Sequence, residues 1–142
     1  MTFTERYTVA GLVIGLVTVA TYVVVVVVRA VTDGLPLTEV AWQGPMLWSL
    51  IIGGGLYALI FLAFWLRVRR EPHTDSRDQE IERYAQTAGA GMTGLAVLVA
   101  LIMMCLDAPL FWTANVLFIG SFLGSLASGG TTLSAYREGM PA

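Results

Sequence analysis

The sequence predicts an all-α fold, a transmembrane four-helix bundle built from two tandem helical hairpins. Hydrophobic residues make up 56% of the 142 positions and charged residues 13%, about half the charged share of a soluble domain. Several apolar runs are each long enough to cross a bilayer, which takes about 20 helical residues. We therefore expect a single membrane domain over residues 1–142, with spans at about 8–29, 46–66, 84–106 and 110–134.

The first span, 8–29, closes with the valine run Val23–Val28 and then Arg29. In water such a run favours a strand, but here it continues a longer uncharged stretch, so we predict a helix in lipid. The span is not expected to be a cleavable signal peptide, because its apolar run is too long and Glu5 and Arg6 stand in front of it.

The connections between the spans differ in length and in their turn residues. Residues 30–45 contain Gly and Pro signals, and the segment 36–42 forms either a short helix in the membrane interface or a plain loop. Residues 107–110 form a tight turn, so the last two spans are expected to be an antiparallel hairpin. The central loop, 67–83, contains the capping-box spacing Ser76–Gln79, which predicts that the third helix begins near residue 76.

The arginines indicate how the spans are oriented. The chain has eight Arg and no Lys, and Arg29 alone lies on one side of the predicted layout. The seven on the other side are Arg6, Arg67, Arg69, Arg70, Arg77, Arg83 and Arg137. Because positive charge concentrates on the cytoplasmic side, both termini and the loop 67–83 are predicted to be cytoplasmic. The expected location is the cell membrane, which the chain crosses several times.

The polar composition excludes several classes of function. A net charge of −2 gives no electrostatic hold on nucleic acid. The single Cys105 cannot form a disulfide within the chain, and the single His73 cannot supply a multi-histidine metal or haem site. Apart from His73, Asp75 and Asp78, nothing suggests catalysis, so we expect neither an enzyme nor a cofactor or metal site.

Small residues at helical spacing mark the expected packing surfaces, because helices in lipid associate through close backbone approach. Gly11 and Gly15 form a GxxxG pair, and the glycines at 53–55 imply a close neighbour or a kink in the second span. The expected packing residues are Gly11, Gly15, Gly53, Gly54, Gly55, Gly89, Gly94, Gly120, Gly124, Ser125 and Ser128.

The fourth span has one small, hydroxylated face and one bulky face. Gly120, Gly124 and Ser128 belong to a set of small residues within about 140° of the helix circumference. This face is either a tight helix–helix seam, in which the hydroxyls bond to backbone carbonyls, or the lining of a narrow polar pathway. Asn115 and Gln86, each just inside a span, are expected to make hydrogen bonds between helices.

The start of the third helix is expected to project into the cytoplasm with a charged surface. Asp75 and Asp78 stand where the helix dipole favours negative charge. This short stub is either a solvated anchor for the span or a docking surface for a partner. The residues of that surface would be Asp75, Arg77, Asp78 and Glu82.

Two charged segments carry a resemblance to a known family. The stretch DSRDQEIE at 75–82 and the segment YREG at 136–139 resemble motifs of small four-helix integral membrane proteins that are common in archaea. Members typically carry an Asp-Glu-Arg-Asp-like motif followed by Ile, and a Tyr-Arg-x-Gly-like tail; Ser76 stands where the family tends to have Glu. The resemblance implies a four-helix fold and a membrane location, and it implies no activity because the family has none assigned.

These observations lead to two hypotheses of function. In the first, the protein acts by helix association within the lipid bilayer, as a homo-oligomer or as an accessory or assembly subunit of a membrane complex. In the second, it is a small channel or transporter whose path follows the Ser and Thr face of the fourth span. The glycine stripes and the projecting third helix favour the first hypothesis.

Overall fold

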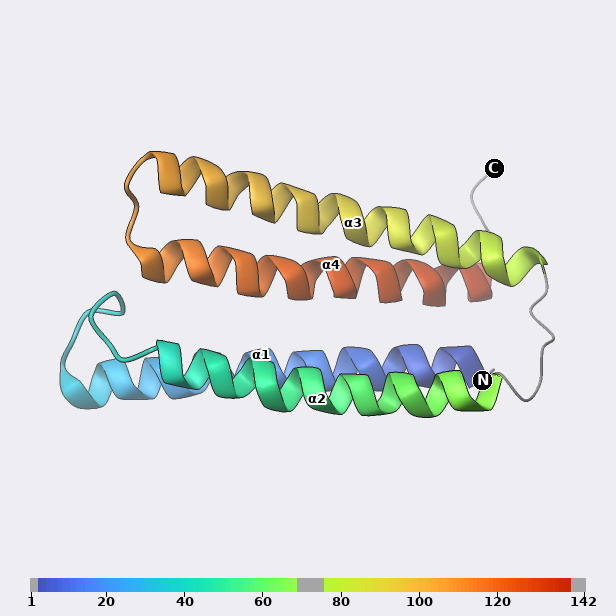
Figure 1. Cartoon of the computed structure of the whole chain (residues 1–142), viewed down its shortest axis with the longest axis horizontal. Helices are drawn as coiled ribbons and strands as arrows, with labels where there is room; N and C mark the ends of the chain where they lie inside the picture. The colour runs from blue at the N-terminus through green and yellow to red at the C-terminus, as the bar shows by residue number, and fades with distance from the viewer. Residues whose placement is uncertain (1–2, 69–75, 139–142) are drawn as a thin grey trace.

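The computed structural model describes residues 3–68 and 76–138, and the side chains of 7–66 and 79–136. Within these ranges it contains four α-helices and no strand (Figure 1). The helices are α1 (Phe3–Asp33), α2 (Gln43–Val68), α3 (Ser76–Cys105) and α4 (Leu110–Glu138). The expected all-α fold with four helices is confirmed, and the valine run at 23–28 is helical.

Each helix contains a stretch that is long and apolar enough to cross a membrane. These stretches are Tyr7–Asp33, Gln43–Leu66, Gln79–Cys105 and Leu110–Tyr136. Large apolar side chains along all of the helices point outward rather than into a common core. Extended apolar surface of this kind suits contact with lipid, so the described chain has the architecture of a multi-pass membrane protein.

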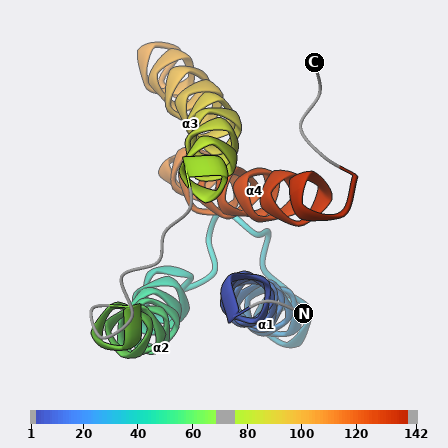
Figure 2. The same ribbon diagram turned by 90° about the vertical axis from the view of Figure 1, so that its right-hand side faces the viewer.

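The helices lie in the spatial order α2, α1, α4, α3, and Figure 2 shows α4 as a layer between α3 and the other two. The first helix packs against both α2 and α4, whereas α2 packs only against α1 and α3 packs only against α4. Within the described residues, α2 therefore does not pack along its length against α3 or α4, and the bundle stays open on that side. Only at its start does α2 take part, through Met46, in an apolar cluster with Phe111 of α4.

The two ends of the bundle differ in what they hold. The starts of α1 and α3 and the ends of α2 and α4 lie at one end, which we call the terminal end (Figure 1). The opposite end, which we call the loop end, holds residues 34–42 between α1 and α2 and residues 106–109 between α3 and α4.

At the loop end, α1 and α3 each stop at a residue in the left-handed conformation. Gly34 has φ 64°, and the N–H of the following residue donates to the Ala30 carbonyl at 3.1 Å. Asp107 has φ 52°, and the N–H of the following residue donates to the Met103 carbonyl at 2.9 Å. Both are Schellman-type helix ends. Glycine adopts this conformation without steric penalty, whereas a side chain costs about 1 kcal/mol.

The connection between α1 and α2 is a plain loop rather than an interfacial helix. It contains one turn, in which the Glu39 N–H donates to the Pro36 carbonyl at 2.9 Å. After this turn the chain returns to the bundle, where Val40 and Trp42 are buried. The loop thereby becomes part of the packing at the loop end.

Candidate functional site

Aromatic and apolar side chains from α1, α2 and α4 meet at the loop end and form what we call the loop-end junction. Its buried members are Tyr22, Val26, Trp42, Met46 and Phe111, with Leu37, Ala114 and Phe118 packed against them. Trp42 meets Phe111 edge-on with ring centroids 5.8 Å apart, which is a geometry that aromatic pairs prefer. The junction joins α1 and the start of α2 to the start of α4.

A buried hydrogen bond crosses this junction. The Tyr22 hydroxyl donates to Oδ1 of Asn115 at 2.9 Å, and the Asn115 amide donates to the Phe111 carbonyl at 2.8 Å. The expected bond from Asn115 to another helix is confirmed, and it is a polar contact between α1 and α4. Gln86 differs from expectation, because it donates to Glu82 of its own helix at 3.1 Å.

The small-residue stripe of α1 lies between two neighbouring helices. Gly11 and Thr18 face α2, whereas Gly15 and Tyr22 face α4. At about 100° per residue, the first pair lies along one edge of the stripe and the second pair along the other. A Cβ added to Gly53 of α2 would lie 2.6 Å from the Thr18 side chain, so this contact requires a glycine.

The closest backbone approach in the described chain joins α3 to α4, in what we call the glycine seam. A Cβ added to Gly89 would lie 2.8 Å from both the Gly124 carbonyl oxygen and the Ser128 Cβ. One added to Gly124 would lie 2.9 Å from the Gly89 carbonyl oxygen, and one added to Gly120 would collide with the Ala96 side chain of α3. Four of the expected packing residues therefore come together here, and the backbones touch as glycine pairs allow.

Other expected packing residues have no close neighbour on another helix among the described residues. No described neighbouring atom lies within 4 Å of the position that a Cβ would take on Gly54, Gly55 or Gly94, and all three glycines are exposed. Ser125 is also exposed, and its hydroxyl donates to the Ser121 carbonyl at 3.2 Å. These positions face outward from the single chain.

Several hydroxyls on the small-residue face of α4 bond along their own helix. Ser121 donates to the Leu117 carbonyl at 2.7 Å, and Thr132 donates to the Ser128 carbonyl at 3.0 Å. Such bonds satisfy a hydroxyl without water. The geometry of this face therefore suits helix packing and gives no support to a polar pathway.

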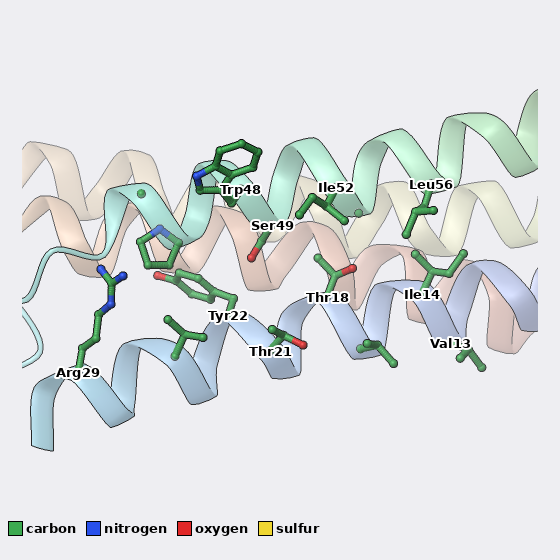
Figure 3. A pocket seen from close by; sticks show the side chains of 15 residues that line it. Val13, Ile14, Thr18, Thr21, Tyr22, Arg29, Trp48, Ser49, Ile52 and Leu56 are labelled. Atoms are coloured by element: carbon green, nitrogen blue, oxygen red, sulfur yellow. The ribbon is translucent and has the colours of Figure 1, made fainter. Parts of the chain in front are cut away.

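A groove of about 600 Å³ lies between α1 and α2 (Figure 3), a volume typical of ligand sites. Arg29 stands at its loop end, and its guanidinium donates to the Ala41 carbonyl at 3.1 Å. Tyr22 comes next along the groove, Ser49 and Thr21 follow it, and apolar side chains such as Leu56 line the far part. Sequence reasoning missed this groove, because it treated Arg29 only as a charge at the end of a span.

The expected docking residues are only partly within the described structure. Asp75 lies outside the described residues. Arg77 and Asp78 belong to the first turn of α3, and their side chains lie outside the described ones. Glu82 is exposed and accepts the hydrogen bond from Gln86. The docking surface therefore stays a prediction.

Within the described residues, no three His, Cys, Asp or Glu side chains gather where they could hold a metal ion. Cys105 is exposed at the end of α3, and His73 lies outside the described residues. No family model, curated protein or solved structure matches this chain. Its function is therefore inferred only from structural features, namely the loop-end junction, the glycine seam, the groove between α1 and α2, and the outward-facing glycines.

Proposed function

We propose that the protein is a multi-pass protein of the cell membrane that acts by helix association, with a second copy of itself as the partner. In this proposal the terminal end lies in the cytoplasm, because seven of the eight arginines of the sequence flank it. The proposal includes no catalytic step and no cofactor.

The outward-facing glycines in the middle of α2 carry this proposal. A glycine inside a helix costs about 1 kcal/mol relative to alanine, and in membrane helices close approach of a neighbour offsets that cost. Gly53 has such a neighbour in Thr18, whereas Gly54 and Gly55 have none within the described chain. A helix from a second copy would supply it.

The open side of the bundle supports the same conclusion. Within the described residues α2 packs along one helix and α3 packs along one helix, with no contact between them. A second copy packed on α2 would give this helix a second neighbour. A two-fold arrangement would place the same α2 surface of each copy at the axis.

Cysteine crosslinking tests the contact directly. Gly54→Cys, in a Cys105→Ser background reconstituted in lipid, is expected to form a disulfide-linked dimer, because a two-fold contact brings the two thiols together. Leu98→Cys is the matched control, since Leu98 is exposed but belongs to α3, a helix that the proposed contact does not use. It should remain monomeric under the same oxidation.

Native mass spectrometry gives the second measurement. The Gly54→Leu, Gly55→Leu double variant should be monomeric under conditions in which the wild type is a dimer, with unchanged helical content. A strictly monomeric wild type would overturn the proposal. Recovery of a different membrane protein, held by the same α2 surface, would replace the second copy with the role of an accessory subunit.

A further inference from the structure

The side chains that line the groove between α1 and α2 change from charged to polar to apolar along its length, in the same order as the parts of a phospholipid. Arg29 stands at the loop end, the hydroxyls of Thr21 and Ser49 follow, and Ile14 and Leu56 line the far part (Figure 3). The rise of α1 from Ile14 to Arg29 is roughly 22 Å. One leaflet contributes about 15 Å of hydrocarbon, so the groove is long enough for one acyl chain and its headgroup region.

Arg29 provides the charge at the mouth of this groove. Within the described residues its hydrogen-bond partner is neutral, the Ala41 carbonyl at 3.1 Å, and a guanidinium has further N–H donors for an external acceptor. Guanidinium groups bind phosphate through paired, charge-assisted hydrogen bonds. Arg29 can therefore bind a lipid phosphate, and its positive charge favours a headgroup that carries no cationic group of its own.

We propose that this groove binds one anionic phospholipid from the membrane leaflet at the loop end. The lipid phosphate accepts hydrogen bonds from Arg29, and the ester oxygens lie toward Thr21 and Ser49, whose hydroxyls donate. One acyl chain lies along the apolar wall that includes Ile14 and Leu56. The bound lipid covers part of the α2 surface beside its single protein neighbour, α1. This role is separate from self-association through Gly54 and Gly55.

A second cleft differs from this groove because no cationic side chain lines it. It lies between α3 and α4, has a volume of about 410 Å³, and its polar side-chain groups are the Asn115 amide and the Trp112 indole N–H. Ile119 and Leu123 belong to its apolar wall. An acyl chain can contact this cleft, but no cation is present there to recognise a headgroup. The cleft therefore serves as an internal control.

Native mass spectrometry in mild detergent, with phosphatidylglycerol or phosphatidylcholine of matched acyl chains added in steps, tests the headgroup preference. The wild type should retain one phosphatidylglycerol about tenfold more tightly than phosphatidylcholine, because both lipids offer a phosphate to Arg29 but the choline cation cancels the net charge and is repelled by the guanidinium. Arg29→Gln should abolish this preference while leaving helical content unchanged. Asp33→Asn, one turn further along α1, removes a nearby negative charge and should retain or increase the preference.

Filling each cavity separates the groove from other lipid contacts. Ser49→Trp should weaken phosphatidylglycerol binding at least tenfold, whereas Ile119→Trp in the second cleft should leave it unchanged. Equal binding of the two lipids by the wild type, or an unchanged preference in Arg29→Gln, would overturn the proposal. A disulfide-linked dimer through Ser49→Cys would also overturn it, because protein rather than lipid would then cover the groove. The Gly54→Cys result is independent of all these outcomes.

Discussion

The α3–α4 half of the bundle is closed by glycine facing glycine, whereas the α1–α2 half is held by glycine facing a side chain. In the glycine seam, Gly89 and Gly124 bring two backbones into contact. Between α1 and α2, Gly53 meets the Thr18 side chain, and a groove of about 600 Å³ remains beside the contact. Glycine facing glycine therefore gives close packing of one helix pair, whereas glycine facing a side chain leaves a groove in the other.

The largest loss of stability is expected from a bulky substitution in the glycine seam. Gly124→Leu places a side chain against the Gly89 carbonyl and Thr93, so we expect a loss of about 3 kcal/mol in the free energy of unfolding. Circular dichroism during unfolding in detergent measures it. Gly94→Leu is the control, because Gly94 is exposed on the same pair of helices and should lose no more than about 0.5 kcal/mol. Equal effects of the two substitutions would contradict the glycine seam.

A smaller effect is expected at the corresponding contact of the open half. Gly53→Leu collides with Thr18, but α2 has only one neighbouring helix and can move away from it. We expect a loss of about 1–2 kcal/mol. Adding Thr18→Ala should recover most of this loss, because it removes the colliding atoms. The same unfolding measurement checks both variants, and a loss as large as that of Gly124→Leu would show that the halves are equally tight.

Between the halves, the Tyr22–Asn115 hydrogen bond should contribute about 1 kcal/mol, since polar contacts between membrane helices average about 0.6 and reach about 1.7. Tyr22→Phe removes the donor and leaves the buried Asn115 oxygen without it. A double-mutant cycle with Asn115→Ala, read from unfolding free energies, isolates the pair. A coupling energy of zero would mean that this hydrogen bond does not help to join the two halves.

Substitutions at the helix ends should change stability least. The change should be a gain at the end of α3 and a loss at the end of α1. Asp107→Gly relieves a left-handed side chain at the end of α3, and we expect a gain of about 0.5 kcal/mol. Gly34→Ala introduces the same strain at the end of α1 and should be destabilising. Thermal unfolding of the two variants against the wild type measures both shifts. Shifts in the same direction would contradict the left-handed conformation at one of the two ends.

Much of the fold could be predicted because it depends on local properties of the sequence. Hydropathy and length define the helices, and the Gly and Pro signals place a plain loop or a short helix after α1. The loop proved to be plain, because it folds Trp42 back into the junction instead of lying in the interface. The Asn115 prediction succeeded because a buried amide requires a partner, and Tyr22 provides it.

What could not be predicted depends on which helices are neighbours. The stripe of α1 was visible in the sequence, but spacing alone does not reveal that Gly11 and Gly15 face different helices. Consecutive glycines at 53–55 point in different directions, so one of them meets α1 and the others face outward. The groove escaped prediction for the same reason. It lies beside the contact between α1 and α2, and spacing in the sequence does not reveal where that contact is.

The central position of α1 has a consequence for the order in which the protein is made. One edge of its stripe packs on α2, which follows directly, but the other awaits α4, and Tyr22 and Asn115 are 93 positions apart. At a synthesis rate of about 5–20 residues per second, the acceptor is made roughly 5–20 seconds after the donor. During that interval the hydroxyl of Tyr22 is present in the nascent hairpin without its acceptor, so the packing of α1 is complete only after α4 has been synthesised.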